Sequence, residues 1–593
     1  MAEFFAQHSA LIGLAIITLV FIAFVIERHP PEVVACGGAA AFLLCGYLTA
    51  DEITAVFSNP APITIAAMFV LSGTLIRTGV LDAAANWLVT HAAERPAVAL
   101  VATAAGVILA SAFINNTPVV IVLIPIAVEI ARTLKIAETK LLMPLSFVTI
   151  LGGTCSMIGT STNLLVDGVA RGQGLEPFSI FEITPIGIVA AAVGLLYLSL
   201  VGWRLLPSRN SVNAKLAEND ADSYFTEIVV RDGASAIGKP LGEVGALSSR
   251  GVRPVALRRG TETLRRDINA IELQKSDRII LFASPEEILT LHASDGFRVA
   301  RTLAPRPGEE RVIVEATVAP HRRGVGRGIW ELTGLSGSGT AVLGVRRHRH
   351  VPGPSLGETR LRPADRLLLE GSADSIATIS EANDLVGVNV SRARRFRREK
   401  APLAIAALAG VILVAAFGIT KIQTAAFVAI AAILLLRVID ADEAWRSIRG
   451  DLLILIFAML AIGTGMEQAG TAQMIVDAVT PYIENASPFV VLLVVYALSS
   501  TLTEIVTNNA VAVIITPIAV ALGAKLGIDP RSLVVAVMFG ASASFATPIG
   551  YQTNTLVYAA GNYRFMDFVK VGLPMNIIVG LATTIAIYFY YPS

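Results

Sequence analysis

The order of hydrophobic and polar positions divides this 593-residue chain into two long apolar stretches and a polar middle region. The apolar stretches cover residues 1–206 and 401–593, and each contains a series of apolar runs of about 17 to 25 residues, the length of a membrane-spanning helix. The middle region, residues 207–400, is rich in Arg, Asp and Glu and shows strand-like alternation. The pattern predicts an integral membrane protein with two membrane segments and a soluble insert.

Both membrane segments contain the same series of predicted helices. A long apolar stretch in each, Pro96–Ile130 and Pro488–Leu522, is too long for one helix and too short for two crossings with a loop. Amide side chains interrupt both stretches, which predicts re-entrant hairpins, with Asn116 near the tip of the first. The remaining predicted spans are Ala10–Ile26, Pro31–Ala50, Pro62–Gly79, Leu141–Asp167 and Ile183–Leu205, then Leu403–Gly418, Gln423–Leu436, Leu452–Gly470, Leu533–Ala559 and Val571–Tyr591.

Polar motifs recur at a fixed distance in the two segments. Asn508 follows Asn116 by 392 positions (508 minus 116), and Asn554 follows Asn163 by 391 (554 minus 163). An unsatisfied amide in hydrocarbon costs several kcal/mol, so such motifs persist only where they line a cavity or bind something. The pairing predicts an internal duplication that carries a site, a pattern typical of transporters.

Charge predicts how the segments are oriented. Five crossings per segment is an odd number, so the two segments would insert upside down relative to each other, with both hairpin tips near the midplane. The positive-inside rule then places the insert in the cytoplasm and both termini on the outer side of the inner membrane. The cytoplasmic face would collect Arg28, Arg77, Arg95, Arg132, Lys135, Lys140, Arg204, Arg437, Arg446, Arg449, Arg564 and Lys570, and the outer face Arg171, Lys421, Lys525 and Arg531.

Composition excludes other classes of protein. The chain is 54% hydrophobic and 16% charged, so we expect membrane lipid to surround it. Its net charge of +1 argues against nucleic acid as a partner. No nucleophile, base and orienting group occur together, so we expect no enzyme activity and no catalytic residue.

The insert is also duplicated. Asp277-Arg278 and Asp365-Arg366 lie in similar sequences 88 positions apart (365 minus 277). This pattern resembles the TrkA-C domain of potassium-channel regulatory subunits and predicts two α/β domains, at 207–305 and 306–400. The resemblance implies dimerisation and, in some members, a small regulatory ligand.

Asparagine suits a site that holds ions of both signs, because its uncharged amide both accepts and donates hydrogen bonds. Hard cations such as sodium prefer oxygen ligands, and half-helix N-termini favour anions. An anion site therefore needs no buried Arg or Lys, and none lies beside the motifs in the sequence. The expected oxygen ligands are Ser111, Asn116, Thr503 and Asn508, with backbone carbonyls at Gly159 and Ala546.

Two other interpretations apply to these residues. Small and polar side chains also let membrane helices pack closely, but four motifs duplicated in matching order favour a transport site. Glu504 is a lone intramembrane carboxylate whose matched position is Ala112. It either makes a structural hydrogen bond or couples protons or cations.

The motifs resemble those of the divalent anion/sodium symporter family, within the wider ion transporter superfamily, over essentially the whole chain. The similar sequences are Asn115-Asn116-Thr117 with Thr507-Asn508-Asn509, and Gly159 to Asn163 with Ala546 to Asn554. The branch with inserted TrkA-C domains, often assigned to sulfate uptake, is the most similar. The fold implied is an all-α polytopic membrane protein, with an inverted repeat and two re-entrant hairpins, that works as an elevator against a dimeric scaffold and carries an α/β insert.

The resemblance also implies a homodimer that co-transports sodium with a small divalent anion. One sodium site would use Ser111, Asn115, Asn116 and Gly159, and a second Thr503, Thr507, Asn508 and Ala546. Substrate would contact Asn116, Thr117, Thr160, Asn508, Asn509 and Thr547, and Glu504, Asn163 and Asn554 would have coupling or structural roles.

Departures from the family pattern affect the expected substrate. Asn115 and Asn509 replace the Ser and Thr of the family motifs, and Ser161-Thr162 stands where dicarboxylate carriers often have prolines. These changes favour sulfate over a dicarboxylate. The alternatives are a cation/proton antiporter or arsenite-type exporter that uses Glu504, and a cytoplasmic sensor in which the insert carries the main function.

Overall fold

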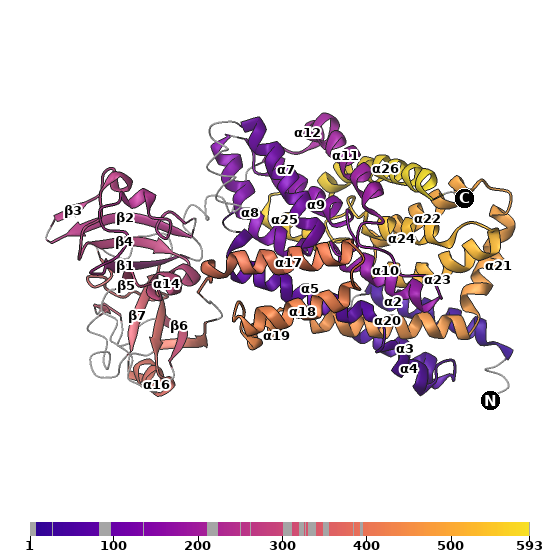
Figure 1. The fold of residues 1–593 in the computed structure, drawn as a ribbon, viewed down its shortest axis with the longest axis horizontal. Coiled ribbons are helices and arrows are strands. Elements are labelled where there is room, and N and C mark those ends of the chain that lie inside the picture. The colour runs from indigo at the N-terminus through magenta and orange to yellow at the C-terminus, as the bar shows by residue number, and fades with distance from the viewer. Residues whose placement is uncertain are drawn as a thin grey trace. The chain divides into compact units, whose positions relative to one another are not determined.

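The fold consists of a helical unit and a unit built on a β-sheet (Figure 1). The first comprises Met1–Ile76, Trp87–Ser211 and Lys400–Ser593, and the second Arg77–Asn86 and Val212–Glu399. The structure, a computed structural model, describes residues 7–26, 28–81, 83, 96–134, 136–209, 223–249, 251–260, 262–299, 311–319, 325–326, 328–329, 340–347, 355–382, 385–391 and 395–591.

The first membrane segment forms the apolar helices that the sequence predicts, with one correction. The span predicted over Leu141–Asp167 is two helices, α9 and α10, because residues 154–160 leave the helix at the Gly159 motif. The helices are α2 Ser9–Ile26, α3 Pro31–Leu44, α4 Ala50–Val56, α5 Pro60–Arg77, α7 Pro96–Phe113, α8 Asn116–Thr133, α9 Thr139–Gly153, α10 Ser161–Gly172, α11 Thr184–Tyr197, the π-helix Leu198–Gly202 and α12 Trp203–Leu205.

The second membrane segment repeats this order. The span predicted over Leu533–Ala559 is likewise divided, into α24 and α25, by the non-helical residues 543–551. The helices are α17 Ala401–Ala416, α18 Ile422–Leu435, α19 Ala441–Ser447, α20 Gly450–Gln468, α21 Thr471–Ile483, α22 Pro488–Thr503, α23 Asn508–Leu526, α24 Pro530–Ser542, α25 Gln552–Ala560 and α26 Phe565–Tyr590. The sequence patterns did not predict the short helices α4 and α19 or the amphipathic helix α21.

The two segments exchange their short helices. In the first segment α7 and α8 both pack on α9, and in the second α22 and α23 both pack on α24. Helix α10 of the first segment, however, packs on α23 and α24, while α25 of the second packs on α8 and α9 (Figure 1). The exchange brings four helix breaks, far apart in the sequence, into one region of the helical unit.

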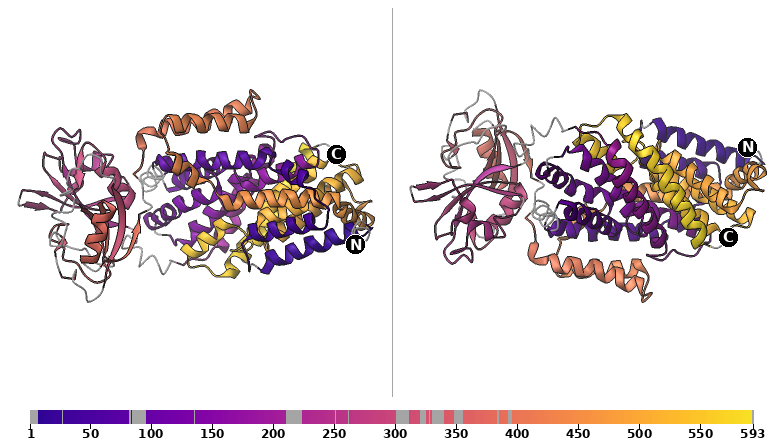
Figure 2. Two further views of the ribbon diagram at one scale, coloured as in Figure 1. Left: turned by 90° about the horizontal axis from the view of Figure 1, so that it is seen from below. Right: turned by 90° about the horizontal axis from the view of Figure 1, so that it is seen from above.

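The surface of the helical unit is apolar. Among the described residues, seven helices are long and apolar enough to cross a membrane. Large side chains such as Leu19, Phe417, Leu435 and Phe589 are mostly exposed, which would be costly in water and favours a hydrocarbon environment. Helix α17 lies at the margin of this unit in both views of Figure 2, and only Ala404 and Val411 are buried on it.

In the described part of the second unit, the sheet has nine strands. Its two halves have the same antiparallel order, β2-β4-β1-β5 and β7-β8-β6-β9, and join where Phe225 of β1 pairs with Val345 of β7. Strand β3 adds to the first half, and helices α14 and α16 follow β4 and β8. The bounds are β1 Tyr224–Val230, β2 Val252–Arg259, β3 Glu262–Leu264, β4 Arg278–Ala283, α14 Pro285–His292, β5 Phe297–Val299, β6 Val312–Val318, β7 Ala341–Arg346, β8 Arg366–Gly371, α16 Ala373–Ala382 and β9 Leu385–Val390, with short 3-10 turns at Leu241–Glu243, Ile268–Ala270 and Arg398–Lys400.

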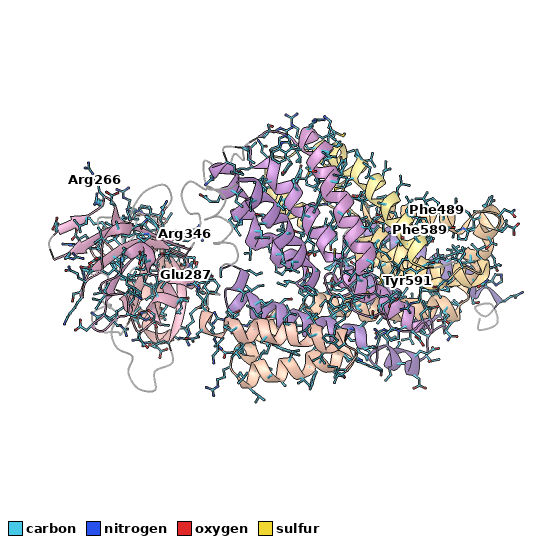
Figure 3. The ribbon with its side chains drawn as sticks, turned by 45° about the horizontal axis from the view of Figure 1, so that its top comes forward. Arg266, Glu287, Arg346, Phe489, Phe589 and Tyr591 are labelled. Atoms are coloured by element: carbon cyan, nitrogen blue, oxygen red, sulfur yellow. The ribbon has the colours of Figure 1, made fainter. Side chains whose placement is uncertain are left out.

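An Arg–Asp pair recurs in the two halves of the sheet. Arg259 donates two hydrogen bonds to the buried Asp277, of 2.9 and 2.7 Å, and Arg347 donates two of the same lengths to Asp365. Each carboxylate also accepts a backbone N–H at 2.8 Å. Glu287, which Figure 3 labels, also belongs to this unit. It forms an ion pair with Arg398. The 88-residue repeat is therefore present in the contacts as well as in the sequence, and the division into TrkA-C domains stays a prediction.

Candidate functional site

Two short breaks, between α7 and α8 and between α22 and α23, make matching hydrogen bonds. The single proton of the Ser111 hydroxyl is shared between the side-chain carbonyl of Asn116 and a backbone carbonyl of α9, the latter at 2.7 Å. The proton of the Thr503 hydroxyl is shared in the same way between Asn508, at 2.9 Å, and a backbone carbonyl of α24, at 2.8 Å. In both cases one hydroxyl fixes the amide at the start of the next helix, so the predicted pairs are brought together.

The longer breaks, before α10 and α25, also match. The residues that precede the two helices have nearly identical backbone angles, with φ −136° and ψ 145° at Thr160 and φ −139° and ψ 139° at Tyr551. Asn163 and Asn554 each donate at 3.0 Å to the backbone carbonyl seven residues earlier. These bonds hold the non-helical segments against their helices, and the coupling or structural role of the two asparagines stays a prediction.

Backbone carbonyls converge on Gly159. A Cβ atom at this position would lie 2.5 Å from the Gly153 oxygen, 2.7 Å from the Ser111 oxygen and 3.0 Å from the Ala112 oxygen. Any side chain would therefore displace these uncharged oxygen atoms, which are of the kind that sodium prefers as ligands. Only glycine fits at position 159, because the carbonyl oxygens approach its Cα so closely.

The counterpart of Gly159 in the second segment is Gly550, 391 positions later (550 minus 159). A Cβ at Gly550 would lie 3.0 Å from the Thr503 carbonyl oxygen and would also meet the hydroxyls of Ser544 and Thr547. Ala546, whose carbonyl is the expected ligand in the second segment, lies four residues before Gly550. Its role as a sodium ligand stays a prediction.

Glu504 is held by donors from the break after α24. Its carboxylate accepts the backbone N–H groups of Ala546 and Thr547, both at 2.8 Å, and the amide of Asn576 at 2.8 Å. The hydroxyl of Ser544 adds a fourth bond at 3.3 Å. The carboxylate thus ties the end of α22 to the neighbouring break, and the N–H groups of Ala546 and Thr547 are occupied.

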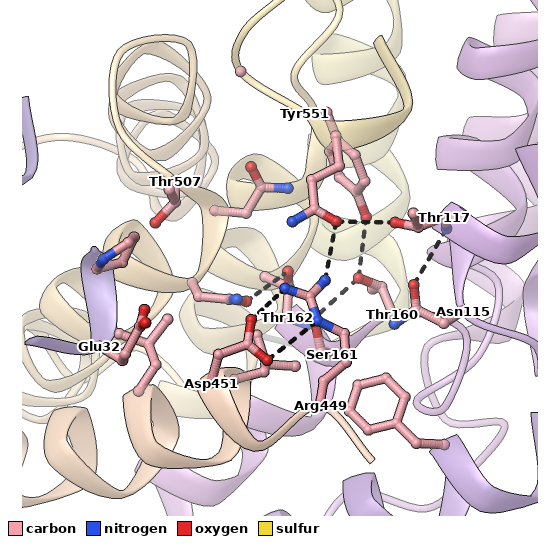
Figure 4. Close-up of a pocket in the computed structure, with 18 of the residues that line it drawn as sticks. Glu32, Asn115, Thr117, Thr160, Ser161, Thr162, Arg449, Asp451, Thr507 and Tyr551 are labelled. Carbon is pink, nitrogen blue, oxygen red and sulfur yellow. Dashed lines mark hydrogen bonds and ion pairs between the residues drawn. The ribbon is translucent and has the colours of Figure 1, made fainter. Parts of the chain in front are cut away.

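The breaks surround a polar cavity of about 260 Å³ (Figure 4). Oxygen and nitrogen atoms from both segments face it, so the duplicated motifs contribute to one site. The residues that line it are Pro31, Glu32, Phe69, Asn115, Thr117, Thr160, Ser161, Thr162, Arg449, Asp451, Leu452, Leu455, Thr507, Asn508, Asn509, Ile549, Gly550, Tyr551 and Gln552.

The predicted site residues fall into two groups. Six line the cavity directly, and the others form the hydrogen-bonded shell around it; Asn116, for example, is only 2% exposed. The lining group is Asn115, Thr117, Thr160, Thr507, Asn508 and Asn509; the shell is Ser111, Asn116, Gly159, Thr503, Glu504, Ala546, Thr547, Asn163 and Asn554.

Sequence reasoning missed two important lining residues, Arg449 and Tyr551. Arg449 precedes α20, pairs with Asp451 at 2.5 Å and donates to Gln552 at 3.3 Å (Figure 4). Arg449, whose side chain is 44% exposed, thus lies beside the motifs in the fold although it is distant from them in the sequence. Tyr551 could not be recognised from the polarity pattern, because its hydroxyl contacts the first segment only after the chain has folded.

The fold and the site together define a class of protein. A predominantly helical unit with helices apolar enough to cross a membrane, and a polar cavity at paired helix breaks, is that of a multi-pass membrane transporter.

Comparison with known proteins identifies the family. The family model described as "Citrate transporter" (CitMHS) matches residues 21–536 and 505–593, and the chain belongs to this family. An uncharacterized transporter of Synechocystis sp. is 31% identical, with 99% of this chain and 98% of the relative aligned. Sodium/sulfate cotransporter 1 of Chlamydomonas reinhardtii is 24% identical, over 89% of this chain and 84% of the relative. A sodium-dependent dicarboxylate transporter of Staphylococcus saprophyticus is 29% identical, over 26% of this chain and 30% of the relative.

These similarities settle the general class. The family and the relatives are transporters, so the prediction that the chain is not an enzyme is confirmed. The chain is a multi-pass membrane protein of the ion transporter superfamily.

Proposed function

We propose that the protein is a secondary active symporter that imports a small divalent anion together with sodium, with sulfate preferred to a dicarboxylate. The names of the relatives support this class of substrate: they include sodium/sulfate cotransporters and a sodium-dependent dicarboxylate transporter. The departures of the motifs from the dicarboxylate pattern, such as Ser161-Thr162, favour sulfate.

One observation carries the proposal: the same hydrogen-bonded break occurs twice around one cavity. Ser111 with Asn116, and Thr503 with Asn508, each fix an amide beside backbone carbonyls. Uncharged oxygens of this kind suit sodium, while helix N-termini at the same cavity suit an anion. We assign one sodium site to Ser111, Asn115, Asn116 and Gly159, and the other to Thr503, Thr507, Asn508 and Ala546, with Gly550 beside the Thr503 carbonyl.

The substrate would bind in the cavity between the two sodium sites. Thr117, Thr160, Asn508 and Asn509 supply donors there without a full charge. Asn116 and Thr547, which were expected to contact substrate, would act from the shell, because Asn116 is buried and the Thr547 N–H is bonded to Glu504.

Transport would follow an elevator mechanism in which the two segments form an inverted repeat and the helix pairs α7–α8 and α22–α23 are re-entrant hairpins. The exchange of α10 and α25 between the segments supports one mobile body built from both. Exposed apolar helices such as α17 support contact with lipid or with a second copy of the chain in a homodimer. The charge distribution supports a cytoplasmic insert and outer termini, in the inner membrane.

The insert would be a structural or regulatory domain pair of the TrkA-C type. Its two halves repeat one strand order and one Arg–Asp pair, which supports a duplicated module. A small regulatory ligand remains part of this proposal.

Uptake by the purified protein in proteoliposomes tests the function. We expect an inward sodium gradient to drive accumulation of radiolabelled sulfate, with succinate and citrate as weaker competitors. Empty vesicles and a potassium gradient are the controls. Absence of sodium-stimulated accumulation of sulfate, succinate and citrate alike would contradict the proposal.

A further inference from the structure

Tyr551 occupies a duplicated position at which the two segments carry very different side chains. Its counterpart is Thr160, 391 positions earlier (551 minus 160), and the two residues share the same backbone angles. Thr160 accepts the N–H of Thr162 at 3.4 Å and so caps its own helix. Tyr551 makes no such cap to α25. The larger side chain instead reaches across to the first segment.

The hydroxyl of Tyr551 occupies polar groups on the first-segment side of the cavity. It accepts the amide of Asn116 at 2.7 Å and lies 3.2 Å from the Thr160 hydroxyl (Figure 4). Because the side-chain carbonyl of Asn116 is bonded to Ser111, both ends of that amide are engaged. The Tyr551 side chain therefore covers the Asn116 amide, while Thr117, Ser161 and Thr162 of the first segment still line the cavity.

The matching amide of the second segment stays available. The side-chain carbonyl of Asn508 accepts from Thr503, as that of Asn116 does from Ser111, but the Asn508 amide nitrogen makes no hydrogen bond to any residue that the structure describes. Thr507 likewise makes no side-chain cap to α23, whereas Asn115 caps α8 at 3.3 Å. The free donors thus lie at the N-termini of α23 and α25, where helix dipoles add partial positive charge.

The two classes of anion differ in the donors that they need. A tetrahedral oxyanion presents all its oxygens to one cluster of donors. A dicarboxylate needs two separated clusters, and Tyr551 covers Asn116, the amide that matches Asn508 in the first segment.

We propose that Tyr551 determines the size of the transported anion by covering the Asn116 amide, so that a substrate meets a free amide only at Asn508, which favours a compact tetrahedral oxyanion over a dicarboxylate. This inference rests on the proposed anion symport. It differs from it in naming the residue that separates sulfate from dicarboxylates.

Substitution by the symmetry-related residue tests the inference. In proteoliposomes, we expect Tyr551→Thr to let unlabelled succinate compete with sodium-driven sulfate uptake at least tenfold better than it does in the wild type, and to permit uptake of labelled succinate. Tyr551→Phe keeps the ring and removes the hydroxyl, so its ratio of succinate to sulfate inhibition should stay within about threefold of the wild type. Tyr558→Thr removes a ring from α25 outside the cavity and should leave the ratio unchanged.

The outcomes separate this inference from the function on which it rests. If wild type shows sodium-driven sulfate uptake but Tyr551→Thr keeps the wild-type ratio, the role of Tyr551 is overturned and symport stands. A shift as large in Tyr551→Phe as in Tyr551→Thr would also overturn it, because the hydroxyl would then decide. If Tyr551→Thr does not fold, Tyr551→Leu replaces it and must give a shift of the same sign. Wild type without sodium-driven flux of any anion would contradict symport itself.

Discussion

At the scale of single residues, hydrogen-bond capacity decides which polar groups can meet an ion. Asn116 has both ends of its amide engaged, by Ser111 and Tyr551, whereas the amide nitrogen of its counterpart Asn508 is available among the described residues. In the sequence, Asn116 and Asn508 occupy matched positions of the same motif and cannot be told apart. Only the partners that the fold supplies distinguish a structural amide from one that can contact substrate.

Glu504 is expected to stabilise the fold without coupling protons. Glu504→Gln replaces an acceptor oxygen with an NH₂ group that opposes the N–H donors of Ala546 and Thr547. Losing hydrogen bonds to a charged acceptor should lower the free energy of unfolding by about 2 kcal/mol or more. Thermal unfolding of the purified protein measures this, and the exposed Glu484→Gln is the control. Loss of pH-gradient-driven cation exchange in Glu504→Gln, with no anion flux in either protein, would instead favour an antiporter.

Arg449 is expected to attract the anion to the cavity. Of the described residues that line it, Arg449 is the one with a cationic side chain. Arg449→Gln should raise the KM for sulfate about tenfold, equivalent to about 1.4 kcal/mol, with little change in kcat. Arg446→Gln removes the same charge three residues earlier, from an exposed position that does not line the cavity. Equal KM values for the two variants would show that the position of Arg449 is unimportant.

At the scale of elements, interruptions in the helices matter more than the helices themselves. Most apolar helices could be predicted, because in a membrane a long apolar run bounded by Pro and Gly satisfies its backbone hydrogen bonds by forming a helix. Three short or amphipathic helices, α4, α19 and α21, were not, since they lack a long apolar run. The sequence shows a motif at Gly159, but the flanking residues are apolar, so the hydropathy pattern predicts one uninterrupted span over Leu141–Asp167.

The break before α10 should not tolerate a side chain at Gly159. Gly159→Ala places a Cβ within 2.5 to 3.0 Å of three backbone oxygens, so the carbonyls must separate. We expect at least a tenfold rise in the sodium concentration that half-activates sulfate uptake. Gly106→Ala in α7 meets no atom within 4 Å and is the matched control. An unchanged sodium response in Gly159→Ala would remove these carbonyls from the proposed sodium site.

At the scale of the whole molecule, duplication organises both units. The helical unit repeats at 391 to 392 positions (554 minus 163, 508 minus 116) and the sheet at 88 (365 minus 277). Both periods could be read from the sequence and recur as matching hydrogen bonds. The exchange of α10 and α25 and the meeting of Tyr551 with Asn116 could not be read, because they depend on how the two copies pack and not on either copy alone.

The Arg–Asp pairs are expected to stabilise the insert. Asp277→Asn breaks a buried double hydrogen bond to Arg259 and should lower the free energy of unfolding by about 2 kcal/mol or more. Asp232→Asn breaks an exposed pair with Lys275 and should cost less than about 0.5 kcal/mol. Thermal unfolding and limited proteolysis of the full chain measure both. Equal stability of the two variants would contradict the structural role of Asp277.

The most direct test of the central claim is equilibrium binding of radiolabelled sulfate to the purified protein as sodium is varied. The claim is that two matched helix breaks each hold a sodium ion and together bind one anion between them. We predict that sulfate binds only with sodium, and that Ser111→Ala and Thr503→Ala each weaken sodium-dependent binding by a similar factor. Sulfate binding that is independent of sodium, or that survives both substitutions unchanged, would contradict the account.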